Sequence, residues 1–167
     1  DVDGAIAQLE DALEFAMNND EVAECLLLKV EAQLAKNDLD GAKTTLASVP
    51  EEAAQSEQLV FTLGRLHYEL GQLDKAAPLI QSATEKQPQL ADAHYYWGLI
   101  CDERGDISAA TQAFLKTRMY DLQRPPPSWS PSAEEFVAIV RNAVGKLDAA
   151  LAPFVREAEV YVIDVPG

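Results

Sequence analysis

Residues 63–114 read LGRLHYELGQLDKAAPLIQSATEKQPQLADAHYYWGLICDERGDISAATQAF, and one pattern begins twice in this stretch, 34 residues apart, with its second copy continuing to Leu122. The matching positions are Leu63-Gly64, Gly71, Leu73, Ala76, Ile80, Ala83 and Pro88 in the first copy and Trp97-Gly98, Gly105, Ile107, Ala110, Phe114, Thr117 and Leu122 in the second. A weaker copy stands one period earlier, at Asn37, Leu39, Ala42 and Leu46. Such a period, with two apolar segments around a Gly or Asn turn, predicts helical hairpins stacked into an all-α solenoid.

The repeated small residues each have a steric reason. Gly64 and Gly98 allow the first helix of a unit to lie close against the second, where a β-carbon would push it away. Gly71, Gly105 and Asn37 stand where the first helix must end, and these residue types accept the left-handed backbone conformation at low cost. The alanines at the recurring position are small because we expect the two helices to be nearest there. Leu46, Ile80 and Phe114 follow four residues later on the same face and should fill the core.

These residues resemble the tetratricopeptide repeat (TPR) family. The resemblance divides residues 1–124 into a half repeat at 1–19 and full repeats at Ala23–Ser56, Glu57–Leu90 and Ala91–Arg124. The large aromatic residue usual at the fourth position of a unit is replaced here by Leu26, Val60 and His94. The resemblance implies a curved array that presents the first helix of every unit on its concave side.

The remaining segments extend this plan. The chain from Asp1 to Asn18 is read as the second helix of a repeat, and Glu51–Leu70 as one long helix. Residues 125–131 contain three consecutive prolines and predict a stiff connector. Residues 132–167 predict a capping helix with Ser132 and Glu135 as a capping box, followed by a short strand at Val160–Val165. Trp129 in the connector is expected to cover the last repeat, or else to fold back into the groove.

Charge limits the class of partner. The formal net charge is −15, and residues 1–56 hold 13 acids and 3 bases, which is −10. This excess repels phosphate backbones and anionic lipid surfaces, so we expect neither nucleic acid nor membrane as a partner. Cys25 and Cys101 fall in different repeats and are expected to be free, which favours the cytoplasm. The first interpretation of this excess is a solvated acidic face that keeps the protein soluble, and a dedicated site for a basic partner is the alternative.

No pattern in this sequence predicts catalysis. His67 and His94 occupy packing positions of their repeats, so we expect part-buried imidazoles with hydrogen-bond partners, no metal and no cofactor. Residues 132–167 loosely resemble the opening of the minimal zincin-like metallopeptidase domain of bacteria, through Ala133–Phe136, Leu151–Phe154 and the strand before Pro166. The zinc-binding His-Glu-x-x-His helix of that family has no counterpart here. This segment is therefore not expected to be an enzyme, although the resemblance implies a metallopeptidase part in the parent protein.

Protein–protein interaction is the function that we predict, with a peptide or partner domain in the concave groove. The TPR resemblance places these groove residues, with Glu24 and Asp92 beside them: Leu27, Glu31, Leu34, Phe61, Arg65, Tyr68, Tyr95, Leu99 and Asp102. The family's best-known clamp holds a carboxylate with Lys, Arg and Asn, but Leu27, Glu31 and Tyr95 replace them here and leave Arg65 as the one clear cation. A neutral or basic segment with an apolar anchor therefore suits the groove better than an acidic tail.

Three alternatives stay open at this stage. Phe61, Tyr68 and Tyr95 can equally well pack only against neighbouring helices. The repeats can recruit substrates for a metallopeptidase-like domain that lies outside this sequence. Self-association through the exposed first helix or the unpaired terminal strand is the third alternative.

Overall fold

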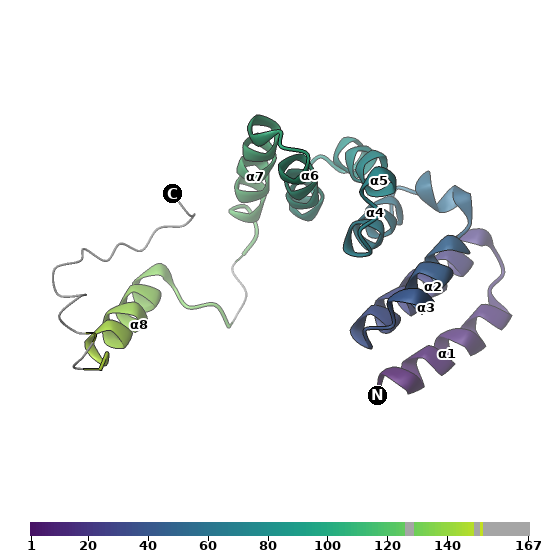
Figure 1. The fold of residues 1–167 in the computed structure, drawn as a ribbon, viewed down its shortest axis with the longest axis horizontal. Helices are drawn as coiled ribbons and strands as arrows, with labels where there is room; N and C mark the ends of the chain where they lie inside the picture. Colours follow the sequence, from purple (N-terminus) through teal and green to yellow (C-terminus); the bar gives the residue numbers. More distant parts are fainter. Residues whose placement is uncertain (126–128, 149–150, 152–167) are drawn as a thin grey trace. The chain divides into compact units, whose positions relative to one another are not determined.

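The computed structural model describes residues 1–125, 129–148 and 151, and it divides into two compact units, Asp1–Arg124 and Pro125–Gly167. The first unit is helical throughout its length (Figure 1). Its elements in chain order are α1 (Val2–Phe15), α2 (Asn19–Ala35), α3 (Leu39–Ala47), the 3-10 helix η1 (Glu51–Ala54), α4 (Val60–Glu69), α5 (Leu73–Lys86), α6 (Ala91–Glu103) and α7 (Ile107–Asp121). The second unit contributes α8 (Ala133–Gly145).

Three helical hairpins, α2–α3, α4–α5 and α6–α7, follow one another along the first unit, as predicted (Figure 1). The second residue after the first helix of each hairpin has a positive φ, of 61° at Asn37, 73° at Gly71 and 77° at Gly105. The next amide in each turn donates to a carbonyl five residues back, with N···O distances of 2.9, 2.8 and 2.9 Å at residues 38, 72 and 106. One turn geometry therefore closes every hairpin, and the predicted left-handed conformations are confirmed.

The close approach of the two helices in a hairpin is also confirmed. A β-carbon built on Gly64 would lie 2.9 Å from Ile80 Cδ1, and one on Gly98 would lie 2.5 Å from Phe114 Cε1. Ala42, Ala76 and Ala110 are buried. Leu46 and Ile80 are buried behind the alanines, whereas Phe114 is only half-buried and lies against Gly98.

The core is built where consecutive hairpins meet. The first apolar cluster joins α2, α3, η1 and α4, with Val30, Leu46, Ala53 and Leu66 among its buried members. A second joins α5 to α6 around Ile80 and Ile100, and a third joins α4, α5 and α6 around Val60, Ala83 and Ala93. Each hairpin thus buries its apolar face against its neighbour, which is how a repeat array gains stability.

The prediction of one long helix over Glu51–Leu70 is wrong. The segment divides into η1 and α4, with a turn at residues 55–59 between them. The break lets Ala53 bury itself against the first apolar cluster. The carbonyls that the break leaves outside the helix gain partners from the next hairpin, because Lys86 Nζ donates to Gln55 O at 2.5 Å and Gln87 Nε2 donates to Glu57 O.

The two end helices have no buried residues. α1 is held to α2 by ion pairs from Lys29 to Glu10, at 2.6 Å, and from Lys36 to Asp3. α8 begins with the predicted capping box, in which Ser132 and Glu135 bond each other's backbone amides. Burial of α8 against the array stays a prediction, and the predicted strand at Val160–Val165 lies outside the described residues. No helix in the described part of the chain has the length and apolarity that crossing a bilayer requires.

Candidate functional site: the face of the first helices

The predicted groove residues lie on the three first helices of the hairpins, α2, α4 and α6. α4 contacts both α2 and α6, so side chains of the three helices come together on one surface. Tyr95 is 44% exposed and Asp102 is exposed, whereas Leu27 is only 2% exposed and belongs mainly to the core. The other six predicted residues, Glu31, Leu34, Phe61, Arg65, Tyr68 and Leu99, are half-buried.

Arg65 does not stand free on this surface. Its Nη1 lies 2.9 Å from Glu69 Oε1, one turn further along α4, and its Nη2 pairs with Glu31 Oε1 of α2. Glu31 and Arg65 are 34 residues apart, so the ion pair joins the same position of two successive repeats. Partial burial lowers the pKa of Arg65, but its bonds to Glu69 and Glu31 outweigh burial and raise it overall. The cation singled out from the sequence is therefore engaged within the array.

Tyrosine hydroxyls make two more bonds between α4 and α6. Tyr68 Oη donates to Glu103 Oε1 at 2.6 Å, and Tyr96 Oη donates to Glu69 Oε1 at 3.0 Å. Burial, and after it the bond to a glutamate, raises the pKa of each tyrosine to about 12. Both hydroxyls therefore stay protonated as donors at neutral pH.

The aromatic rings pack across the same junction. Tyr96 makes edge contacts with Phe61, Tyr68 and Tyr95, at centroid distances of 5.9, 5.5 and 5.7 Å. Tyr96 was not among the predicted residues, although it is the neighbour of Tyr95 and the centre of the cluster. The aromatic residues thus pack on one another, and Tyr95 keeps the most exposed surface of the predicted three. Such packing favours a rigid surface.

A pocket of about 240 Å³ opens between α2 and the start of α4. It is lined by Glu24, Leu27, Leu28, Glu31, Gln58, Leu59 and Thr62. Glu24, Leu27 and Glu31 were predicted from the sequence. Leu28, which is 47% exposed, was not predicted, and neither were the lining residues at the start of α4. The volume is below the 300 Å³ or so of small-ligand sites and fits a side chain. Its lining combines three leucines with the carboxylates of Glu24 and Glu31.

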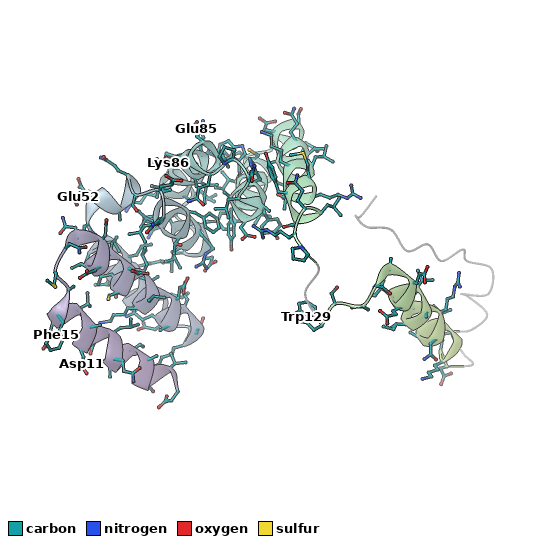
Figure 2. All side chains as sticks on the ribbon, turned by 180° about the vertical axis from the view of Figure 1, so that it is seen from behind. Asp11, Phe15, Glu52, Glu85, Lys86 and Trp129 are labelled. Carbon is teal, nitrogen blue, oxygen red and sulfur yellow. The ribbon has the colours of Figure 1, made fainter. Side chains whose placement is uncertain are left out.

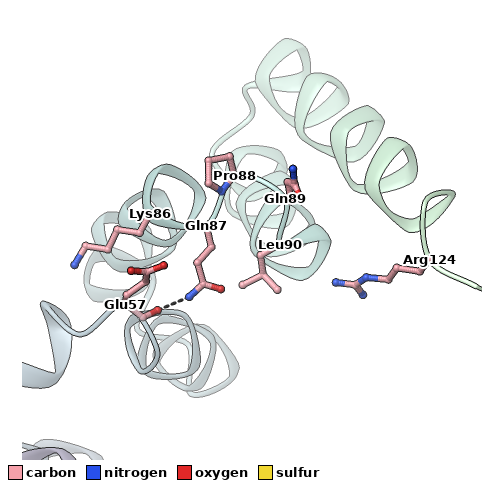
Figure 3. Close-up of a pocket in the computed structure, with 7 residues that line it drawn as sticks. All are labelled: Glu57, Lys86, Gln87, Pro88, Gln89, Leu90 and Arg124. Carbon is pink, nitrogen blue, oxygen red and sulfur yellow. Dashed lines mark hydrogen bonds between the residues drawn. The ribbon is translucent and has the colours of Figure 1, made fainter.

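A second pocket lies at the turn between the second and third hairpins (Figure 3). Its lining residues are Glu57, Lys86, Gln87, Pro88, Gln89, Leu90 and Arg124. Two of its polar side chains already bond the backbone before α4, as Figure 3 shows for Gln87 and Glu57. Arg124 lies 3.6 Å from Asp121. These contacts join repeats, and we assign no ligand to this pocket.

Both histidines are buried and have a hydrogen-bond partner, as predicted. His67 Nδ1 lies 2.7 Å from Gln72 Oε1, and His94 Nε2 lies 2.8 Å from the Pro88 carbonyl. Burial, and to a smaller extent the charge of Lys75, lowers the pKa of His67 although its bond to Gln72 opposes the change. Cys25 and Cys101 are free thiols, and burial raises the pKa of Cys101. The described residues contain no group of three or more His, Cys, Asp or Glu suited to a metal ion.

Trp129 was predicted to cover the last repeat or to enter the groove. Figure 2 labels this side chain. It is 83% exposed. Its role stays a prediction.

Comparison with known proteins shows what this repeat is similar to. The tetratricopeptide repeat family matches residues 61–122, which contain the doubled stretch. No curated protein matches the chain. The two hairpins over this segment are therefore similar to tetratricopeptide repeats.

Three solved structures of MamA share the fold. One, a crystal structure of MamA, is 26% identical with a TM-score of 0.58, covering 72% of this chain and 68% of that one. A MamA structure labelled MSR-1 is 20% identical with a TM-score of 0.54, covering 73% and 68%. Another, labelled AMB-1, is 22% identical with a TM-score of 0.53, covering 79% and 67%. The resemblance of residues 132–167 to a zincin-like metallopeptidase is not supported by these comparisons.

Proposed function

We propose that the first unit is a non-catalytic scaffold that binds a protein or peptide on the face made by α2, α4 and α6. The match to tetratricopeptide repeats and the likeness to MamA support this class of function. The pocket between α2 and α4 is the observation that carries the proposal, because an open, side-chain-sized pocket lies beside a rigid aromatic and acidic surface. Rigid elements hold a binding surface in place without an ordering cost.

The partner that this surface suits is a neutral to basic extended segment with an apolar anchor. The anchor would enter between the leucines at 27, 28 and 59. The neighbouring carboxylates of Glu24 and Glu31 would attract a lysine or arginine beside it. An acidic tail is disfavoured, because Arg65 is already paired with two glutamates and residues 1–56 carry −10.

A displayed library of random peptides tests the proposal. We expect enriched peptides to carry lysine or arginine next to a large apolar residue. Leu28→Ala should then weaken the best peptide by about fivefold or more, because the anchor loses apolar contact area. Leu39→Ala is the matched control, since Leu39 is 45% exposed on α3, a second helix of a hairpin.

Enrichment of acidic peptides would contradict the proposed partner. Equal weakening by Leu28→Ala and Leu39→Ala would contradict the proposed pocket. No observation in the described residues favours the metallopeptidase alternative. Self-association, through the first helix or the terminal strand, and a cytoplasmic location stay predictions, of which sedimentation of the protein tests the first.

A further inference from the structure

Glu31 belongs to two structural features at once. Its carboxylate pairs with Arg65 Nη2, and the same residue lines the pocket beside Leu27 and Leu28. The second nitrogen, Arg65 Nη1, lies 2.9 Å from Glu69 Oε1. The guanidinium of Arg65 therefore pairs with the Glu31 carboxylate, which a basic side chain of a partner would use at the edge of the pocket.

We propose that Arg65 is an internal substitute for a cationic side chain of the partner, so that an arginine or lysine of the bound segment displaces it from Glu31. The inference rests on the proposed function and assigns Arg65 as a residue that sets affinity and specificity. It replaces the simpler view, drawn from the sequence, in which Arg65 itself meets the partner.

The exposure of the ion pair makes exchange feasible. The side chains of Arg65, Glu31 and Glu69 are 23%, 38% and 32% exposed, so water already reaches all three. Ion pairs of this kind contribute little net stability, because solvent and salt screen them. A ligand guanidinium that replaces Arg65 at Glu31 therefore gains a bond similar to the one that is lost.

The rest of the network stays in place when Arg65 leaves Glu31. Glu69 also accepts the Tyr96 hydroxyl at 3.0 Å, and Tyr96 is packed among Phe61 and Tyr68. Arg65 can thus keep its bond to Glu69 within its own helix while Glu31 turns to the ligand. The formal charge of Glu31, Arg65 and Glu69 together is −1, and it becomes −2 when the arginine is neutralised.

Two labelled peptides provide the test, one with a leucine flanked by arginines and the other with citrulline, the neutral isostere, in place of both arginines. Arg65→Gln should tighten binding of the arginine peptide by roughly five- to tenfold at low salt, because two carboxylates lose their internal cation. The affinity of the citrulline peptide should increase much less with the same substitution. The gain should shrink in high salt, where surface charges are screened.

Glu31→Gln should weaken the arginine peptide, because the contested carboxylate is gone. Arg65→Lys should behave like the wild type, since it keeps the cation. Lys43→Gln on α3 is the charge control, because it makes the same change in net charge on an exposed residue outside the three first helices. Circular dichroism of each variant establishes that the helices are intact.

The outcomes separate the two proposals. Weaker or unchanged binding of the arginine peptide to Arg65→Gln, with wild-type binding intact, overturns the inference and leaves the proposed function standing. An equal gain from Lys43→Gln also overturns it, because the effect would then be one of net charge. Binding of neither peptide to the wild type or to Arg65→Gln overturns both. Binding of the arginine peptide to Arg65→Gln alone supports the inference, with Arg65 blocking the site.

Discussion

Side-chain size at a few recurring positions sets how closely the helices of each hairpin approach. A β-carbon on Gly98 would meet Cε1, Cδ1 and Cζ of Phe114 at 2.5, 2.7 and 2.9 Å. The ring also contacts Tyr95, at 5.9 Å between centroids, so a shift of the ring would change that contact. At the scale of single residues, the close approach of the helices therefore depends on the lack of a β-carbon at Gly98 as well as on the contacts made there.

Gly98→Ala should lower the free energy of unfolding by about 1–3 kcal/mol, the usual cost of overpacking. Gly4→Ala is the control, because its β-carbon would have only an ordinary contact, 3.9 Å from Asp1 Oδ2, within helix α1. That change should be neutral or stabilise the protein by up to about 1 kcal/mol, since alanine favours a helix. Urea denaturation measures both. If the two variants were equally stable, close packing at Gly98 would not matter.

Helix ends and helix interruptions determine how consecutive repeats are connected. α5 carries Pro78 in its interior, where a helix loses a hydrogen bond because proline has no N–H. Pro78 is exposed and lines a pocket that also includes Pro50, Leu46 and Ala54 from the segment before α4. The same region holds the unexpected break between η1 and α4. At the scale of elements, this junction combines two irregular features, a break between helices and a proline inside a helix.

Pro78→Ala should raise the free energy of unfolding by about 1–2 kcal/mol, because the restored amide can bond within the helix. Pro50→Ala is the matched control. It lies before η1, outside any helix interior, and should be slightly destabilising because the unfolded chain gains freedom. Thermal unfolding followed by circular dichroism checks both. A loss of stability in Pro78→Ala would mean that the proline ring contributes more through its contacts than it costs the helix.

At the scale of the whole molecule, unbalanced charge opposes the compact state. The chain has 28 acidic and 13 basic side chains, and the excess is greatest in residues 1–56. Ion pairs from Lys29 and Lys36 to α1 relieve only part of it. Self-repulsion of this kind favours expansion and weakens as salt is added.

The midpoint of thermal unfolding should therefore rise by a few degrees, roughly 2–5 °C, between 10 mM and 300 mM NaCl, as a domain of this size responds to about 1 kcal/mol. A variant with Asp11→Asn and Glu14→Gln, both exposed on α1, should have a higher unfolding midpoint at low salt than the wild type. Its midpoint should rise less when salt is added. Differential scanning calorimetry measures the two curves. A midpoint that falls with salt would show that attractive ion pairs outweigh the repulsion.

Much of the fold could be predicted because its determinants are local and recur with the repeat period. The hairpin turns at Asn37, Gly71 and Gly105, and the small residues at Gly64, Gly98 and Ala76, each follow from a steric requirement within one unit. The break after η1 could not be predicted from the segment itself. Its carbonyl partners, Lys86 and Gln87, lie about one repeat further along the chain and meet it only in the folded array.

The sequence alone determined which residue types occur on the first helices, and it indicated an acidic and aromatic surface. Only the tertiary structure decided what those residues do there. It paired Arg65 with Glu31 and Glu69, made Tyr96 the centre of the aromatic cluster and opened a pocket beside Leu28. The physical reason is distance: periodicity follows from contacts within a repeat, whereas each of these features depends on how adjacent helices are placed in space.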